Sequence, residues 1–235
     1  MRILIVGASG GIGAALAREC LTRYAGAEVH GTYFRSSNRR NIDQIHWHKL
    51  DVRREKSIKQ FAEKFDQLDW IINCVGFLHN EHQGPEKNLH SVSSQFYLEN
   101  ISRNTLPTLL LAKYFSAKLK SSDCPKLATL SARVGSISDN RLGGWYSYRS
   151  SKAALNMLIK TLSIEWKRTL PQATVLSLHP GTTDTQLSLP FQANVPKGKL
   201  FRPEKVAQDL LALIASKTAE DSGNFYAYSG ETLPW

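Results

Sequence analysis

Residues 3–13 read Ile3-Leu4-Ile5-Val6-Gly7-Ala8-Ser9-Gly10-Gly11-Ile12-Gly13. The apolar start is typical of a buried strand, and the run Ala14-Ala15-Leu16-Ala17 after the glycines is typical of a helix. A tight loop between a strand and a helix lets backbone N–H groups and the helix N-terminus face a pyrophosphate. We expect Gly7, Gly11 and Gly13 to divide three roles: the tight turn, the close approach of a pyrophosphate, and helix–sheet packing. The alternative is a glycine-rich turn that binds no ligand.

Strand-like and helix-like segments alternate along the rest of the chain, which is the pattern of a parallel sheet with helices on both faces. The sequence therefore predicts an α/β fold with one Rossmann-like, doubly wound sheet, in a single domain over residues 1–235. Ligands of such sheets bind at the carboxyl ends of the strands. We expect the strands at 2–6, 28–33, 46–50, 70–74, 126–130, 174–178 and 225–228, and the helices at 11–24, 57–65, 104–119, 150–170 and 203–216.

The composition indicates the cellular compartment and limits the classes of binding partner that we expect. Of the 235 residues 42% are hydrophobic, and no apolar run approaches the roughly 18 residues that cross a bilayer. The glycines interrupt the apolar start too early for a signal peptide, and three scattered cysteines predict a reducing, cytoplasmic compartment. The net charge of +10 suggests nucleic-acid binding, but the basic residues are dispersed, which favours a solvated basic surface. We expect no membrane, nucleic-acid or metal site.

Tyr148 and Lys152 are the strongest candidates for chemistry. They lie four residues apart, so on a helix they share one face. A cation beside a phenol lowers the pKa of the phenol from its reference value of about 10. Tyr146 is a weaker candidate because Ser150, not a cation, follows it by four residues. The alternative is an exposed tyrosine and lysine that pair on a helix surface.

These features together resemble the short-chain dehydrogenase/reductase superfamily. The shared features are the glycine pattern of residues 7–13, the Tyr-x-x-x-Lys of residues 148–152, and Pro180-Gly181. The stretches 131–137 and 146–149, with the closing residues 233–235, are similar to its C-factor-like and sniffer-like branch. The resemblance runs from Met1 to the C-terminus and implies reduction of a carbonyl by a nicotinamide cofactor. It implies that Tyr148 donates the proton, while Lys152 binds the nicotinamide ribose and lowers the pKa of Tyr148.

The resemblance also implies which residues hold the cofactor. The glycine loop with Ser9 and Ile12 would face the pyrophosphate. Asp51 would accept a hydrogen bond from the adenine amine, and Val52 would cover the adenine ring. Asn73-Cys74-Val75-Gly76 stands where the family has Asn-Asn-Ala-Gly, so Asn73 and Gly76 keep the pattern. Pro180-Gly181 would form the turn that receives the nicotinamide, with backbone groups of Thr183 and the hydroxyl of Thr185 on its carboxamide.

Arg35 predicts the cofactor preference. NAD enzymes place a carboxylate just after the second strand to hold the ribose hydroxyls, but residues 32–37 contain none. A guanidinium at this place can grip a 2′-phosphate through two hydrogen bonds. We therefore predict NADP(H) as the preferred cofactor, with NAD(H) as the alternative. Arg39 and Arg40 are expected to face solvent.

Two further catalytic roles follow from the resemblance. Asn104 corresponds to a helix asparagine that holds a water connecting Lys152 to solvent, with Asn100 as the fallback. The family carries a pair of serines after the fifth strand, of which the second orients the carbonyl, but here that position is Ala132. Ser131 is our candidate for this role, and Ser136 is the alternative.

Residues of about 184–203 are expected to form a lid over the substrate. Leu187, Leu189 and Phe191, with Trp145, predict either an apolar pocket or ordinary core and oligomer contacts. The substrate is expected to be an aldehyde or ketone, or the corresponding alcohol. The resemblance implies a homodimer or homotetramer. An alternative function is a nucleotide-binding regulatory or signalling protein with little turnover, which the missing hydroxyl at Ala132 keeps open.

Overall fold

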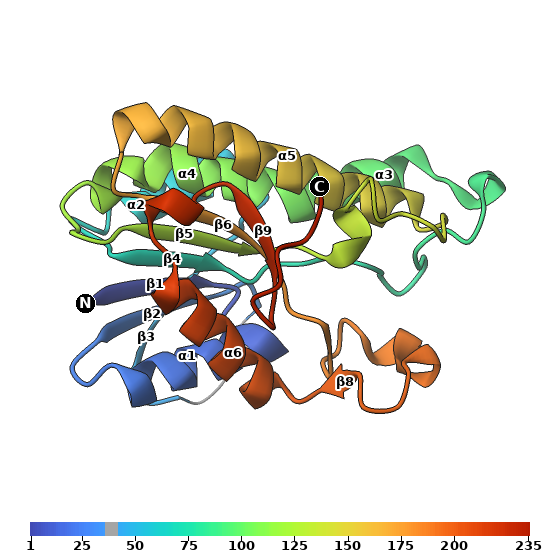
Figure 1. Cartoon of the computed structure of the whole chain (residues 1–235), viewed down its shortest axis with the longest axis horizontal. Helices are drawn as coiled ribbons and strands as arrows, with labels where there is room; N and C mark the ends of the chain where they lie inside the picture. The colour runs from blue at the N-terminus through green and yellow to red at the C-terminus, as the bar shows by residue number, and fades with distance from the viewer. Residues whose placement is uncertain (36–41) are drawn as a thin grey trace.

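The computed structural model describes residues 1–35 and 42–235, so Arg39 and Arg40 lie outside the described residues. Within these residues seven parallel strands form one sheet in the order β3-β2-β1-β4-β5-β6-β9 (Figure 1). The predicted doubly wound α/β sheet is therefore confirmed. Its strands are β1 Arg2–Val6, β2 Glu28–Tyr33, β3 Ile45–Lys49, β4 Trp70–Asn73, β5 Lys126–Leu130, β6 Thr174–His179 and β9 Asn224–Ala227.

Two helical layers bury the sheet on both faces (Figure 1). Residues 3–6 of β1 are all apolar because both faces of the strand are buried: Ile3 and Ile5 join one core cluster, while Leu4 and Val6 join the other. The first face is covered by α1 Gly11–Arg23 and α6 Pro203–Ser216. The second face is covered by α2 Glu55–Ala62, α4 Leu106–Leu119 and α5 Tyr146–Thr169.

The helix predicted at 104–119 is wrong at its start, because the helical segment begins ten residues earlier. It comprises α3 Ser94–Asn100, a π-helical turn Ile101–Thr105, and then α4. The side chain of Ser93 caps the start by accepting a hydrogen bond from the backbone N of Phe96 at 3.4 Å. Pro107 has no N–H to donate to a carbonyl four residues earlier, and a wider turn accommodates this local defect.

The helix predicted at 150–170 also begins earlier, at Tyr146, so that Tyr148 lies inside its first turn. The three preceding residues are all left-handed, with φ of 62° at Gly143, 64° at Gly144 and 53° at Trp145. The remaining short elements are 3-10 turns at Leu89–Ser91, Arg133–Gly135, Leu189–Asn194 and Ala219–Asp221, and a small two-stranded sheet of β7 Thr182–Thr183 and β8 Leu200–Phe201.

Lys126 is a buried cation at the start of β5, far from the carboxyl ends of the strands. Its Nζ donates hydrogen bonds to the backbone oxygens of Ile214, Ala215 and Lys217 at 2.6, 3.1 and 2.5 Å, where α6 ends. Lys126→Met leaves these carbonyls without a donor, so we expect the free energy of unfolding to fall by about 2–4 kcal/mol in urea denaturation. Lys205→Met, on the exposed face of α6, is the control and should cost less than about 1 kcal/mol.

Histidines on β2 and β3 make the stability depend on pH. His30 Nδ1 lies 3.0 Å from His48 Nε2, and His30 Nε2 lies 3.0 Å from Glu28 Oε1. Burial lowers the pKa of His48 to about 4 and also lowers that of His30. In the unfolded chain both imidazoles titrate near pH 6.5. Between about pH 6.5 and 4 the unfolded state thus binds more protons, so the free energy of unfolding falls as the pH falls.

We expect His48→Gln to weaken this pH dependence. Because His48 is only half-buried, its contribution is discounted to about 1 kcal/mol. Urea denaturation of the wild type and of the variant at several pH values between 7.5 and 4.5 measures it. If the free energy of unfolding changed with pH equally steeply in both proteins, the assignment to His48 would be contradicted.

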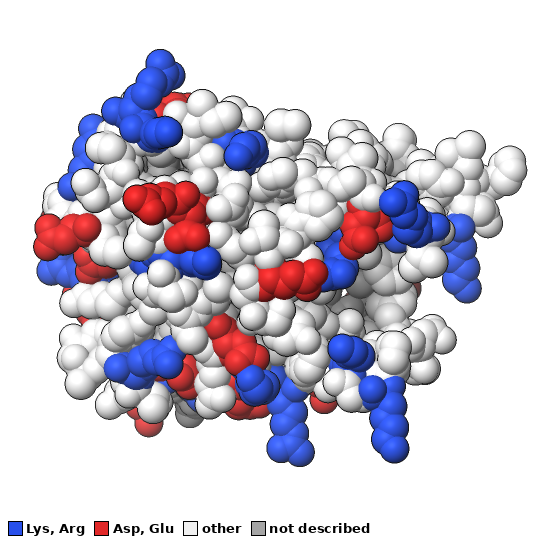
Figure 2. All heavy atoms as spheres, viewed as in Figure 1, with Lys and Arg blue, Asp and Glu red and all other residues white. Residues whose placement is uncertain are grey.

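Charged side chains are interspersed over the surface. Figure 2 shows Lys and Arg side chains among Asp and Glu side chains on the visible face, without one continuous basic patch. On this face the interspersed charges are typical of a solvated surface. Within residues 1–35 and 42–235, no helix has the length and apolar character that crossing a membrane requires.

Candidate active site

Loops at the carboxyl ends of β1, β2, β3, β4 and β6 surround two neighbouring cavities. The first has a volume of about 570 Å³ and the second about 850 Å³, and Ser9 and Gly76 line both. Ten predicted cofactor residues come together here, although the parallel strands that carry them are far apart in sequence. The first cavity is lined by Gly7, Arg35, Asp51 and Val52, and the second by Gly11, Ile12, Gly13 and Thr185, besides the two shared residues.

The glycine loop is a cradle that any side chain at Gly11 or Gly13 would fill. Gly7 has a φ of 84° and its N–H donates to Thr32 Oγ1 at 2.9 Å, which fixes the turn. A Cβ on Gly13 would lie 2.3 Å from the backbone oxygen of Gly7, and one on Gly11 would lie 2.5 Å from Thr185 Cγ2. The exposed backbone at the start of α1 therefore fits the pyrophosphate of a dinucleotide.

Three arginines give the first cavity a positive character. Arg35, Arg53 and Arg103 line it, against the two carboxylates of Asp51 and Glu81. This balance suits an anionic cofactor. The sequence interpretation named only Arg35, because Arg53 and Arg103 have no spacing that distinguishes them from surface arginines.

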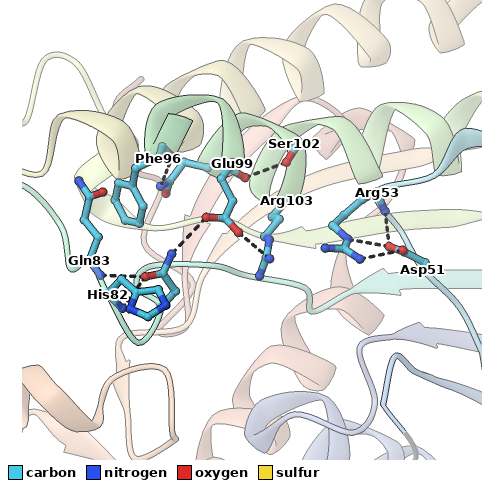
Figure 3. Close-up of polar contacts among 10 residues, drawn as sticks. Asp51, Arg53, His82, Gln83, Phe96, Glu99, Ser102 and Arg103 are labelled. Carbon is cyan, nitrogen blue, oxygen red and sulfur yellow. Dashed lines mark hydrogen bonds and ion pairs between the residues drawn. The ribbon is translucent and has the colours of Figure 1, made fainter. Parts of the chain in front are cut away.

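Asp51 is held by Arg53 (Figure 3). Nε and Nη2 of Arg53 each donate to a different Asp51 oxygen at 2.8 Å, and these hydrogen bonds lower the pKa of the carboxyl. The guanidinium of Arg53 also lies 4.7 Å from the ring centre of Phe34. Oδ1 also accepts from the backbone N of Arg53 at 3.1 Å, whereas Oδ2 keeps a further lone pair. The contact of Asp51 with adenine therefore stays a prediction.

A second ion pair stands on the rim of the same cavity (Figure 3). Arg103 Nη2 lies 2.6 Å from Glu99 Oε1, and the guanidinium lies 4.4 Å from the ring centre of Phe77. Asn80 Nδ2 donates to Glu99 Oε2 at 3.2 Å. These contacts tie the loop after β4 to α3 and the π-helical turn, and so shape one wall of the cavity.

Tyr148 and Lys152 lie in the first two turns of α5, and both are buried, with 8% and 2% of their surfaces exposed. Lys152 Nζ donates to the backbone oxygen of Leu130 at 2.9 Å and lies 5.8 Å from the ring centre of Tyr148. Burial lowers the pKa of Lys152 to about 7 and raises that of Tyr148. Burial therefore acts against any lowering of the phenol pKa by Lys152, and that role of the lysine stays a prediction. The neutral phenol is nevertheless the form that donates a proton.

Asn104 links the loop after β4 to α5. Its Oδ1 accepts from the backbone N of Phe77 at 2.7 Å, and its Nδ2 donates to the backbone oxygen of Phe77 at 2.8 Å and to Ser151 Oγ at 2.9 Å. Asn100 Oδ1 accepts from the same Nδ2 at 3.2 Å. The protein itself thus engages the side-chain amide of Asn104, and the predicted water beside Lys152 stays a prediction.

The two candidate serines make contacts away from Tyr148. Ser131 Oγ donates to Asn156 Oδ1 at 2.7 Å, and Ser136 Oγ accepts from the backbone N of Asp139 at 3.1 Å. In the described part of the chain neither hydroxyl is hydrogen bonded to Tyr148. To orient a carbonyl, Ser131 would have to turn its proton away from Asn156, a residue that the sequence interpretation missed. The serine role stays a prediction.

The turn after β6 packs tightly and lies against the glycine loop. Gly181 has a φ of 72°, and a Cβ there would lie 3.0 Å from the ring of Phe201. Ser188 Oγ donates to the backbone oxygen of Thr183 at 2.5 Å and accepts from the backbone N of Thr185 at 3.3 Å. Ser188 is a further residue that the sequence interpretation missed. Asn73, Pro180, Gly181 and Thr183 do not line either cavity, and their roles stay predictions.

Aromatic side chains form a wall beside Tyr148. The ring centre of Trp145 lies 6.2 Å from that of Tyr148 and 5.3 Å from that of Phe191. Phe191 in turn lies 5.8 Å from His79, on the loop after β4. Leu187 lies near Gly76, since a Cβ added to Gly76 would be 3.5 Å from Leu187 Cδ2. The segment predicted as a lid therefore contacts both the catalytic helix and the loop after β4.

Comparison with known proteins establishes the family. The pattern of the short chain dehydrogenase family matches residues 1–195. The chain belongs to this family. A 1-hydroxy-2-glutathionyl-2-methyl-3-butene dehydrogenase from Rhodococcus sp. is 31% identical over 190 residues, which cover 79% of this chain and 78% of the relative. This short-chain dehydrogenase is therefore an oxidoreductase of a family that uses NAD(P).

Solved structures share the whole fold of this short-chain dehydrogenase. The carbonyl reductase Sniffer of Drosophila melanogaster has a TM-score of 0.84 at 23% identity, with 100% of this chain and 99% of that chain covered. An NADPH-bound carbonyl reductase from chicken fatty liver has a TM-score of 0.85 at 23% identity, with 100% and 98% covered. At this identity the likeness establishes the sheet and its helical layers.

Proposed function

We propose that this protein is an NADP(H)-dependent carbonyl reductase that converts an aldehyde or ketone to an alcohol. One combination of features carries the proposal: a buried tyrosine and lysine lie four residues apart on α5, in a chain whose glycine loop and arginine side chains line two cavities at the carboxyl ends of the strands. NADP(H) supplies the hydride when it is bound. The two similar carbonyl reductase structures, one of them with NADPH, support the same activity.

Tyr148 acts as the general acid in this proposal. Burial keeps its phenol neutral at physiological pH, so the hydroxyl holds a proton for the carbonyl oxygen as negative charge develops there. The carbonyl carbon thus gains the hydride and its oxygen gains the tyrosine proton. Lys152, with a pKa of about 7, is well matched to return a proton to the tyrosinate, and Asn104 stands behind α5 on the expected route to solvent.

Arg35 selects NADP(H) in this proposal, with NAD(H) as the weaker ligand. The chain has no carboxylate directly after β2, and Arg35 lines the first cavity together with Arg53. Negative charge at this place would repel a 2′-phosphate, whereas a guanidinium attracts it.

Trp145 and Phe191 favour an apolar carbonyl compound as the substrate. Their rings, with His79, present an aromatic surface beside Tyr148. Rings of this kind bind apolar and aromatic groups through large contact areas. Residues of about 184–203 are proposed to act as the lid of a single domain.

The outer faces of α4 and α5 support assembly as a homodimer or homotetramer. On α5, Leu155, Leu162 and Trp166 are buried in the core of this chain and are not available for assembly. Instead, Leu109, Met157 and Ile164 are exposed, with 46%, 66% and 62% of their surfaces accessible. The free thiols Cys20, Cys74 and Cys124 fit a reducing compartment such as the cytoplasm.

Parallel fluorescence titrations with NADPH and NADH test the cofactor, and NADPH oxidation with aliphatic and aromatic aldehydes and ketones tests the reaction. We expect tighter NADPH binding and turnover of an apolar carbonyl compound. Binding of neither nucleotide would overturn the proposal. Binding without turnover of any carbonyl compound would favour the nucleotide-binding regulator.

A further inference from the structure

Glu86 is a buried carboxylate that the proposed chemistry does not use. It lies on the loop between β4 and α3, and only 2% of its surface is exposed. Both of its carboxylate oxygens contact the first turn of α5: Oε2 accepts from the backbone N of Ser147 at 3.1 Å, and Oε1 accepts from Ser147 Oγ. Its backbone oxygen accepts from the backbone N of Trp145 at 2.5 Å.

The start of α5 needs such a partner because it has no cap of its own. Trp145 occupies the N-cap position in a left-handed conformation and makes no side-chain capping hydrogen bond. A left-handed non-glycine residue costs about 1–3 kcal/mol and persists only where neighbouring contacts hold it. A carboxylate at a helix N-terminus satisfies free N–H groups and is favoured by the helix dipole. Glu86 accepts from the N–H of Ser147 and places its carboxylate at the N-terminus of α5, although it comes from a remote part of the chain.

The hydrogen bonds between Glu86 and Ser147, which we call the clamp, hold the residue next to Tyr148. Ser147, whose surface is 0% exposed, directly precedes Tyr148. The backbone oxygen of Tyr148 accepts from Ser151 Oγ at 2.8 Å, and Ser151 Oγ accepts from Asn104 at 2.9 Å. The loop after β4 therefore holds α5 at two successive turns, through Glu86 and through Asn104. The same clamp places Trp145, which packs beside Tyr148 and Phe191.

We propose that Glu86 is a positioning residue, whose buried carboxylate caps the first turn of α5 and so sets the placement of Tyr148 and Trp145 for proton transfer. Its effect on turnover rests on the proposed function. Its effect on the helix does not, so the two can be measured separately.

Hydrogen–deuterium exchange of residues 143–152 and steady-state kinetics test the proposal in Glu86→Ala and Glu86→Gln. In Glu86→Ala we expect faster exchange in this segment and a kcat lower by about 100-fold, since a misplacement of about 1 Å has such an effect. The NADPH Kd should stay within about twofold, because Glu86 lines neither cofactor cavity. Glu86→Gln can accept from Ser147 N–H and donate to its hydroxyl, so exchange and kcat should return close to the wild type.

Two controls separate positioning from general damage. Lys87→Ala removes an exposed neighbour on the same loop and should change neither readout. Lys126 lies at the start of β5, and its contacts are with the end of α6. Lys126→Met should therefore lower the free energy of unfolding but leave kcat unchanged at a temperature where the protein is folded. If Glu86→Ala does not fold, Ser147→Ala removes the hydroxyl contact alone and should lower kcat by about 5–10-fold.

Three results would overturn the proposal. They are unchanged exchange of residues 143–152 in Glu86→Ala, a kcat within about threefold of the wild type in that variant, and a Glu86→Gln variant as impaired as Glu86→Ala. If the wild type reduces no carbonyl compound, the proposed function fails, but the exchange data still decide whether Glu86 clamps α5.

Discussion

Tyr148→Phe is expected to lower the kcat for carbonyl reduction by about 1,000-fold, which is the middle of the range of about 100- to 10,000-fold that a general acid contributes. The substitution keeps the aromatic ring, which is buried beside Trp145, and removes only the hydroxyl. Affinity for NADPH should stay within about twofold because Tyr148 lines neither cofactor cavity. NADPH oxidation in the presence of a carbonyl substrate measures the loss, and fluorescence titration measures the affinity.

Tyr146→Phe is the matched control for this prediction. Tyr146 lies two residues earlier in the same helix, but 40% of its surface is exposed. Removal of its hydroxyl should leave kcat unchanged. A Tyr148→Phe protein that retained more than about a tenth of the wild-type kcat would show that another group donates the proton. If that variant lost turnover but kept its biological effect, the regulatory alternative would be favoured.

Arg35→Ala is expected to weaken NADPH binding by about 10–100-fold and to leave NADH binding within about threefold, because only NADPH carries the 2′-phosphate. The lost interaction is a charge-assisted hydrogen bond of about 1.5–3 kcal/mol. The ratio of the two dissociation constants, from parallel titrations, is the decisive measurement. It cancels any general effect of the substitution on the cavity.

Arg54→Ala provides the control, since 79% of the Arg54 side chain is exposed, it does not line the first cavity, and its 3.5 Å contact with Asp51 would affect NADPH and NADH alike. Its ratio of NADPH to NADH affinity should match the wild type. If Arg35→Ala weakened both cofactors equally, Arg35 would not read the 2′-phosphate. Arg53→Ala would then test the neighbouring guanidinium, which Asp51 holds in the same cavity.

Local patterns were sufficient to predict most of the sheet. The strands Arg2–Val6, Glu28–Tyr33 and Lys126–Leu130 have the predicted bounds, and the first and third are mainly apolar or β-branched runs. Their parallel arrangement follows from the helices between them, since each crossover must return the chain to the same end of the sheet. The glycine loop belongs to the same class of prediction, because its strained turn and close packing admit only glycine at Gly7 and Gly13.

Contacts between remote segments could not be predicted in this way. The helix α5 begins four residues before its predicted start because Glu86, sixty-one positions before Ser147, supplies the missing cap. The partner of Ser131 is Asn156 on α5, and no spacing in the sequence announces that pair. Arg53 likewise enters the cavity only because Asp51 and Phe34 meet it there.

The sequence by itself determined the sheet and the cradle at its edge, and it was enough to propose Tyr148 and Lys152 as the catalytic pair, because these depend on patterns within one segment. Only the tertiary structure decided the surroundings of that pair. Burial lowers the pKa of Lys152 to about 7 and raises that of Tyr148, which their spacing alone does not predict. Desolvation is a property of everything packed around a group, so it exists only after distant segments have come together.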